Sequence, residues 1–181
     1  MAAYPVVEFD PDFPYTENDK KMLTRATKLV CDEYRRPFPG AGDLFAGIKV
    51  LFTDKQLMAD GKPALEIYEH GVKTVTVRMT PRMNMRDLWL HGLLLSHGLA
   101  HYAIDRLDSY KACWQLVHYA ENCNPMMVYN VKDARPFIVK GKKQELKMRV
   151  IDVWRLLQDK NRIMTEIKEG RAPPPNPHRY D

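Results

Sequence analysis

Apolar positions are densest in residues 85–105, which read MRDLWLHGLLLSHGLAHYAID. Leucine and tyrosine recur there at helical spacing, at Leu88, Leu95, Leu99 and Tyr102. This spacing predicts an α-helix that is buried on most sides. The stretch from Leu88 to Ile104 is shorter than the roughly 20 apolar residues that cross a bilayer. We therefore expect a core helix and not a membrane span.

Three β-rich segments precede this helix. Residues 47–53 form an apolar run, and residues 72–79 alternate as a half-buried strand does. Residues 64–68 are separated from the last run by Glu69-His70-Gly71, which predicts a hairpin-like turn with a solvated His70. Upstream, Thr16 and Asp19 form a capping-box pattern that predicts a helix to about Tyr34.

Two further helices are predicted after the central one. The first covers residues 112–122, and the second is a long amphipathic helix over residues 143–168 that ends near Gly170. Both termini are rich in proline, and we expect neither to form a regular strand. The predicted organisation is an extended arm (1–16), one domain (17–169) and a Pro-rich arm (170–181), with other subunits ordering both arms.

The central helix carries candidate chemistry as well as apolar side chains. His97 and His101 lie four residues apart, so they share one helix face, and Asp105 continues that face. This is the spacing with which an H-E-x-x-H helix presents two imidazoles to one Zn²⁺. Gly98 stands where that motif has its glutamate, the general base. The alternative is a pair of hydrogen-bonded core histidines with no metal.

A zinc site needs a third protein ligand from outside the first helix. His118 and Glu121 lie close together on the predicted helix 112–122, and either could supply it. The candidate metal ligands are therefore His97, His101, His118 and Glu121, with zinc as the expected ion. No other cofactor and no catalytic residue are predicted.

The amino-acid composition excludes only a few classes of protein function. The 181 residues contain 45% hydrophobic residues, enough for one real core, and 28 Lys and Arg against 23 Asp and Glu give a net charge of +5. These charges are interspersed, so no nucleic-acid partner is expected. The three cysteines form no C-x-x-C, which indicates neither a zinc ribbon nor a disulfide framework. The first residues lack a signal or transit pattern.

The order of predicted elements favours an α+β, zincin-like fold. A helix, a small three-stranded sheet and then the H-x-x-x-H helix follow one another, and zincin domains share that order. Further helices and the extended Pro-rich termini complete the predicted fold.

The sequence also resembles the mitochondrial intermembrane-space metallopeptidases that process a subunit of ATP synthase and assist its assembly. The resemblance covers residues 72–159, about half of the chain. It is carried by the strand at 74–79, by His97 and His101, by Tyr102 with Asp105, by His118, by Val131-Lys132, and by Val150 with Val153-Trp154. It implies a zincin-like fold and a mitochondrial setting.

The chain departs from that family in ways that bear on activity. Gly98 replaces the catalytic glutamate, and Arg78-Met79 and Leu156-Leu157 stand where cysteines are expected. The departures predict a metallopeptidase-like protein without peptidase activity. We expect it to serve as a structural or assembly subunit of a large mitochondrial inner-membrane complex, first of all ATP synthase, with a peripheral contact to the membrane.

Two other functions fit the same residues. One is an active zinc metallopeptidase that uses a different base, Glu121 or Asp105. The other is a basic adaptor of nucleic acid or of a virion, in which the histidines are core residues. Metal content and hydrolysis separate the first from a structural subunit, and salt-dependent nucleic-acid binding identifies the second.

Overall fold

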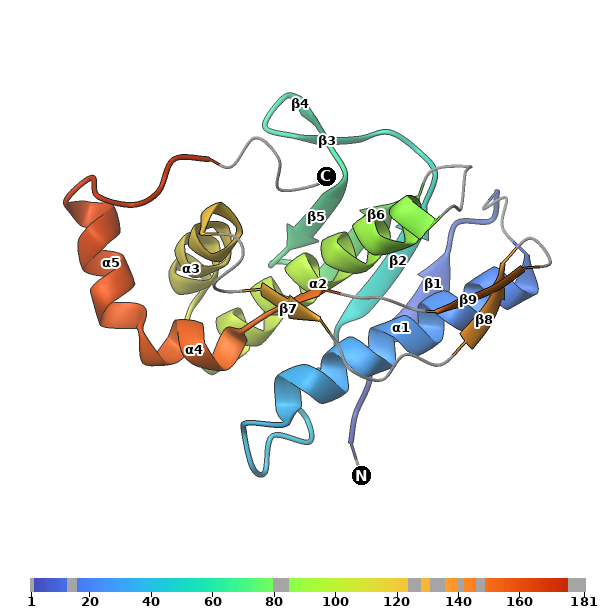
Figure 1. The fold of residues 1–181 in the computed structure, drawn as a ribbon, viewed down its shortest axis with the longest axis horizontal. Coiled ribbons are helices and arrows are strands. Elements are labelled where there is room, and N and C mark those ends of the chain that lie inside the picture. The colour runs from blue at the N-terminus through green and yellow to red at the C-terminus, as the bar shows by residue number, and fades with distance from the viewer. Residues whose placement is uncertain are drawn as a thin grey trace.

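The computed structural model describes residues 2–12, 16–79, 85–123, 128–130, 136–139, 142–145 and 149–175 as a mixed α+β fold with several helices (Figure 1). The helices are α1 (Glu17–Arg35), α2 (Met85–Leu107), α3 (Tyr110–Asn122), α4 (Val153–Gln158) and α5 (Lys160–Lys168). The strands are β1 (Val6–Phe9), β2 (Lys49–Thr53), β3 (Leu57–Ala59), β4 (Lys62–Ala64), β5 (Glu66–Glu69), β6 (Thr74–Arg78), β7 (Val128–Asn130), β8 (Pro136–Val139), β9 (Lys142–Glu145) and β10 (Arg149–Ile151).

The main sheet is small and mixed, with strand order β1-β2-β6-β5. β1 and β6 run parallel to β2, and β5 pairs antiparallel with β6. The three predicted strands are confirmed as β2, β5 and β6, and the expected hairpin joins the last two. Asp60 and Gly61, which both have positive φ, form the turn of a separate hairpin, β3-β4.

The fourth strand, β1, comes from the predicted N-terminal arm, and this corrects the expectation for that segment. Val6–Phe9 is extended, but it pairs with β2 of its own domain and so belongs to the domain's sheet. Pro5 and Pro11 flank the four strand residues without interrupting their hydrogen bonds, as edge strands allow. Tyr4 adds a second attachment, because its hydroxyl donates to Asp32 at 2.7 Å and the Arg35 guanidinium lies 4.5 Å from its ring centroid.

α1 and α2 lie side by side over one face of the sheet (Figure 1). The capping box at the start of α1 is confirmed, with Thr16 and Asp19 each accepting from the other's backbone. α2 is the predicted core helix: Leu95, Leu99 and Ala103 are at most 1% exposed. Tyr34 of α1 connects the two helices, because its hydroxyl donates a hydrogen bond to the Ser96 carbonyl oxygen of α2 at 2.8 Å. Within the described residues, no helix is long and apolar enough to cross a membrane.

The C-terminal region corrects the single long helix predicted over residues 143–168. Two short strands, β9 and β10, occupy its first part, and two short helices, α4 and α5, follow. β10 pairs with β7, a non-local contact that overrides the helical periodicity of its residues. Asp152 then caps α4 by accepting from the Arg155 amide, and Asp159 separates α4 from α5. The described helix α5 ends close to Gly170, as predicted, and Gly170 has the positive φ that is common just after a helix C-terminus.

Some predictions fall on residues outside the described ones. They are residues 13–15 of the N-terminal arm, the Val131-Lys132 pair and the tail at 176–181.

Candidate metal centre

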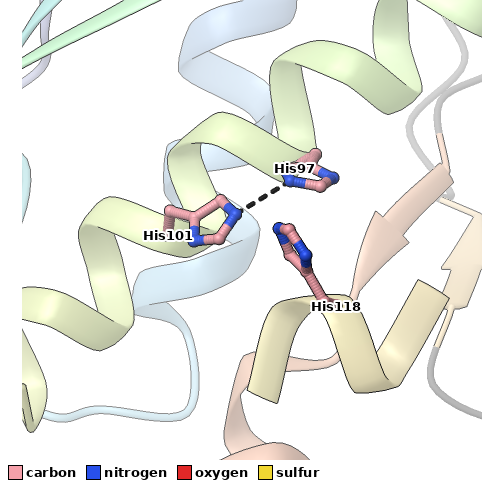
Figure 2. Close-up of side chains that lie close together, drawn as sticks. All are labelled: His97, His101 and His118. Carbon is pink, nitrogen blue, oxygen red and sulfur yellow. Dashed lines mark hydrogen bonds between the residues drawn. The ribbon is translucent and has the colours of Figure 1, made fainter. Parts of the chain in front are cut away.

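Three histidines from two helices converge at one point. His97 and His101 lie one turn apart on α2, and His118 reaches them from α3 (Figure 2). Each offers one ring nitrogen, and these three nitrogens lie within 4.8 Å of one another. His97 and His101 are 5% and 3% exposed, and His118 is half-buried. The three residues are close enough to bind a metal ion.

The local structure of α3 explains how His118 reaches the pair. The Ser109 side chain caps the helix by accepting from the Ala112 amide at 3.1 Å. Trp114 and His118 then lie one turn apart, and their ring centroids are 4.5 Å apart. The indole also lies 5.7 Å from the His101 ring. Aromatic packing on α3 thus holds the third imidazole toward α2.

Glu121 has a different position from that of the three histidines. Its carboxylate contacts His97 Nδ1 and is 3% exposed. His97 Nε2 faces the other way, 2.8 Å from His101 Nε2. An acidic partner on Nδ1 sets the tautomer in which Nε2 is free of hydrogen and able to bind a metal. Glu121 therefore orients His97 from the side opposite the other two histidines, and it is His118 that lies within reach of the pair as a possible third donor.

The geometry of the three donors is compatible with a transition metal such as zinc. Two nitrogens bound to one tetrahedral zinc at about 2.0–2.1 Å are about 3.3 Å apart, so the His97 and His101 rings need to separate by only about 0.5 Å. Burial, with smaller effects from His97 and His118, holds the pKa of His101 well below its ordinary value. The ring is therefore neutral, which is the form that binds metal.

A second carboxylate, absent from the predicted site, lies beside the histidines. Glu66 Oε2 is 3.7 Å from His97 Nε2, and the Glu66 side chain is 7% exposed. Burial raises the pKa of Glu66 to about 7 against the opposing effect of His97, and Glu121 adds to the rise. Among the described residues, Glu66 Oε1 has no hydrogen-bond partner. Leaving a buried acceptor unpaired costs about 1–3 kcal/mol of stability, so some other interaction or a function must account for the position of Glu66.

Gly98 is packed directly against this carboxylate. A Cβ atom at residue 98 would lie 2.4 Å from Val75 Cγ1 and 2.7 Å from Glu66 Oε1. Real Cβ contacts essentially never fall below 3.0 Å. The glycine therefore allows β5 and β6 to approach α2 closely, and Glu66 fills part of the space that a side chain at residue 98 would need.

The site opens into a cavity of about 350 Å³. Apart from Glu66 and the three histidines, its walls are mainly apolar and aromatic. They are Ala59, Pro63, Ala64, Leu65, Ile67, Tyr68 and Trp114. A few polar groups in the wall of a mainly apolar cavity are typical of a ligand site.

Asp105, one of the two alternative bases predicted from the sequence, is bound elsewhere. It accepts from the Tyr68 hydroxyl at 2.6 Å and also contacts His70 Nδ1. His70 is exposed in the turn, as predicted, and its ring also lies 4.8 Å from that of Tyr110. These contacts fasten the β5-β6 turn to the end of α2.

The chain shows no significant match to any family model, curated protein or solved structure. The resemblance of its sequence to mitochondrial metallopeptidases stays a prediction.

The contact between Glu121 and His97 leads to a first prediction. Glu121→Gln keeps the volume of the side chain but removes its charge, so it weakens the hold on His97 Nδ1. We expect zinc affinity to fall by about 10–100-fold, as loss of such an orienting partner usually causes. Competition with a chromophoric chelator measures this affinity, and Glu169→Gln, at an exposed position, is the control. Unchanged affinity would show that Glu121 does not orient the ligand.

Proposed function

We propose that the protein is a zinc-dependent hydrolase in which His97, His101 and His118 hold the metal. The observation that carries the proposal is the convergence of the three ring nitrogens within 4.8 Å. Three imidazoles from two helices are a donor set that zinc favours in proteins. The two α2 histidines are buried with their Nε2 atoms facing each other, which supports metal binding over an ordinary core role.

Catalysis is supported by the number of ligands and by the surroundings. Structural zinc sites are usually closed by four protein ligands, whereas catalytic sites use three and keep one position open. Here three histidines line a cavity that can admit a substrate group. When bound in such a site, zinc supplies Lewis acidity that polarises a carbonyl oxygen. Peptide and other amide bonds are the substrates that this chemistry suits.

A zincin-like fold is part of the same proposal. It is supported by the order of elements, in which α2 follows the strands of a small mixed sheet and carries His97 and His101. The absence of a glutamate at Gly98 remains the main departure from that class.

Two measurements test the proposed function. We expect the purified chain to bind one equivalent of zinc by equilibrium dialysis and elemental analysis, and His118→Ala to lose it. The zinc-loaded protein is expected to cleave members of a mixed peptide library, with cleavage abolished by chelator and by His118→Ala. His70→Ala, a histidine outside the cluster, is the matched control and should retain both properties. Zinc binding without chelator-sensitive cleavage would overturn the hydrolase assignment.

A second candidate is the non-catalytic assembly subunit of a mitochondrial inner-membrane complex, first of all ATP synthase. Gly98 favours it, because its tight packing against Val75 leaves no room for the usual catalytic glutamate. Under this alternative the zinc is structural, and the chain migrates entirely with a large complex on native gels of mitochondrial membranes. A pool of free monomer would argue against it.

A further inference from the structure

We propose that Glu66 is the general base of this site, supplied by strand β5 in place of the side chain that Gly98 lacks. The inference rests on the proposed hydrolase function and names the residue that completes it. The base is then carried by a strand, whereas in an H-E-x-x-H motif it is carried by the same helix as the two histidines.

Strand register places Glu66 on the side of the sheet that faces α2. Glu66 is paired with Val77, and Tyr68 with Val75, in the antiparallel β5-β6 ladder. Residues directly opposite one another in such a ladder project from the same face. Val75 and Val77 are fully buried, and Val75 contacts the position of Gly98 on α2. Glu66 must therefore point toward the same helix, and it lines the cavity together with His97.

One carboxylate oxygen of Glu66 lies close to the proposed metal ligands, and the other lies close to where a side chain at residue 98 would be. Oε2 lies 3.7 Å from His97 Nε2, and Oε1 lies 2.7 Å from where the Cβ atom of residue 98 would be. Oε1 also has no hydrogen-bond partner among the described residues. Oε1 is therefore enclosed beside Gly98, and Oε2, on the side of the histidines, is the oxygen that we assign to the water molecule.

The other acidic groups near the site are already engaged. Glu121 contacts the far nitrogen of His97, and Asp105 accepts from Tyr68. Neither residue is among those that line the cavity, whereas Glu66 is. Glu66 is therefore better placed than either alternative predicted from the sequence.

The step assigned to Glu66 is the activation of water for attack on a peptide carbonyl. A carboxylate oxygen accepts a proton from water while the water oxygen forms a bond to the carbonyl carbon, and the C=O π electrons move to the carbonyl oxygen. When the tetrahedral intermediate collapses, the C–N bond breaks and the Glu66 carboxyl returns its proton to the leaving nitrogen. Water is the only co-reactant, and the products are one carboxylic acid and one amine.

A competing role for the same atoms is that of a fourth metal ligand, which would close the site. The two roles predict different effects on zinc affinity. Removing a base leaves affinity unchanged, whereas removing a ligand raises the dissociation constant by at least about tenfold.

The deciding experiment uses the full-length chain with Glu66→Gln. We expect peptide cleavage to fall by about 10²–10⁴-fold, while the zinc dissociation constant and the visible spectrum of the Co²⁺-substituted protein stay unchanged. Glu69→Gln, an exposed position on the same strand, is the matched control and should leave all three readouts unchanged. Glu66→Ala with added formate provides a second test, because a small carboxylate that enters the vacated space should restore part of the cleavage.

Three other outcomes would each contradict the inference, and they can be told apart. Full cleavage by Glu66→Gln would remove Glu66 from the reaction and leave the hydrolase assignment intact. Weakened zinc binding with an altered Co²⁺ spectrum would make Glu66 a ligand. A zinc-loaded wild-type chain that cleaves no peptide would overturn the proposed function itself.

Discussion

Zinc is expected to raise the melting temperature of the metal-free protein by about 8–16 °C. A ligand at about 1,000 times its dissociation constant stabilises the folded state by about 4.1 kcal/mol, and each kcal/mol shifts the melting temperature of a domain of this size by about 2–4 °C. The three ligands come from α2 and α3, so binding ties together two of the main helices. Differential scanning calorimetry with and without zinc measures the shift.

The effect should depend on the three histidines and on their neutral form. His118→Ala is expected to remove most of the zinc-dependent rise, and His70→Ala to preserve it. Zinc binds imidazole only when the ring is deprotonated, so the rise should shrink as the pH falls. Because burial holds the pKa of His101 well below its ordinary value, this ligand is protonated only at a pH below the usual histidine range. An equal rise in wild type and His118→Ala would place the zinc elsewhere on the chain.

Local patterns in the sequence predict much of this structure. The apolar spacing around Leu95 and Leu99 predicts α2, and the capping box at Thr16 predicts the start of α1. The four-residue spacing of His97 and His101 places both rings on one face whatever the rest of the fold does. His118 was also a candidate, because a zinc site needs a third ligand and the next helix carries a histidine.

The features that local patterns could not predict depend on strand pairing between distant segments. β1 joins the sheet only because Val6–Phe9 pairs with β2, which lies more than 40 residues later in the chain. In the same way, β10 forms only by pairing with β7. Proline content and helical periodicity favoured other structures for both segments. Each is decided by tertiary contacts, which outweigh local propensity.

Glu66 is not predicted from the sequence for the same reason, although two features of the sequence indicate it. Glu66 and Tyr68 alternate with Leu65 and Ile67, which puts a carboxylate on one face of a strand that lies next to β6. A glycine in the middle of a buried helix, as at Gly98, indicates that something packs closely against the backbone there. Only the strand register, which pairs Glu66 with Val77, shows that this carboxylate lies next to Gly98.

The tight contact at Gly98 should make even a small side chain there destabilising. Gly98→Ala should gain up to about 1 kcal/mol from helix propensity. The new methyl group, however, would lie 2.4 Å from Val75 Cγ1, and overpacking of this kind costs about 1–3 kcal/mol. We therefore expect a lower free energy of unfolding, measured by urea denaturation. Gly71→Ala, where the added Cβ would have nothing within 4 Å, is the control and should show little change.

Two further variants connect this packing to the site. Combining Gly98→Ala with Val75→Ala should recover part of the loss, because the two residues are in contact and their effects couple by about 0.5–3 kcal/mol. Gly98→Glu recreates the H-E-x-x-H motif, yet it forces a second carboxylate into the space held by Glu66. We expect it to unfold the chain or to abolish cleavage, because two buried like charges cannot share that space. A folded Gly98→Glu protein with increased cleavage would show instead that the helix position is free to hold the base and that Glu66 does not replace it.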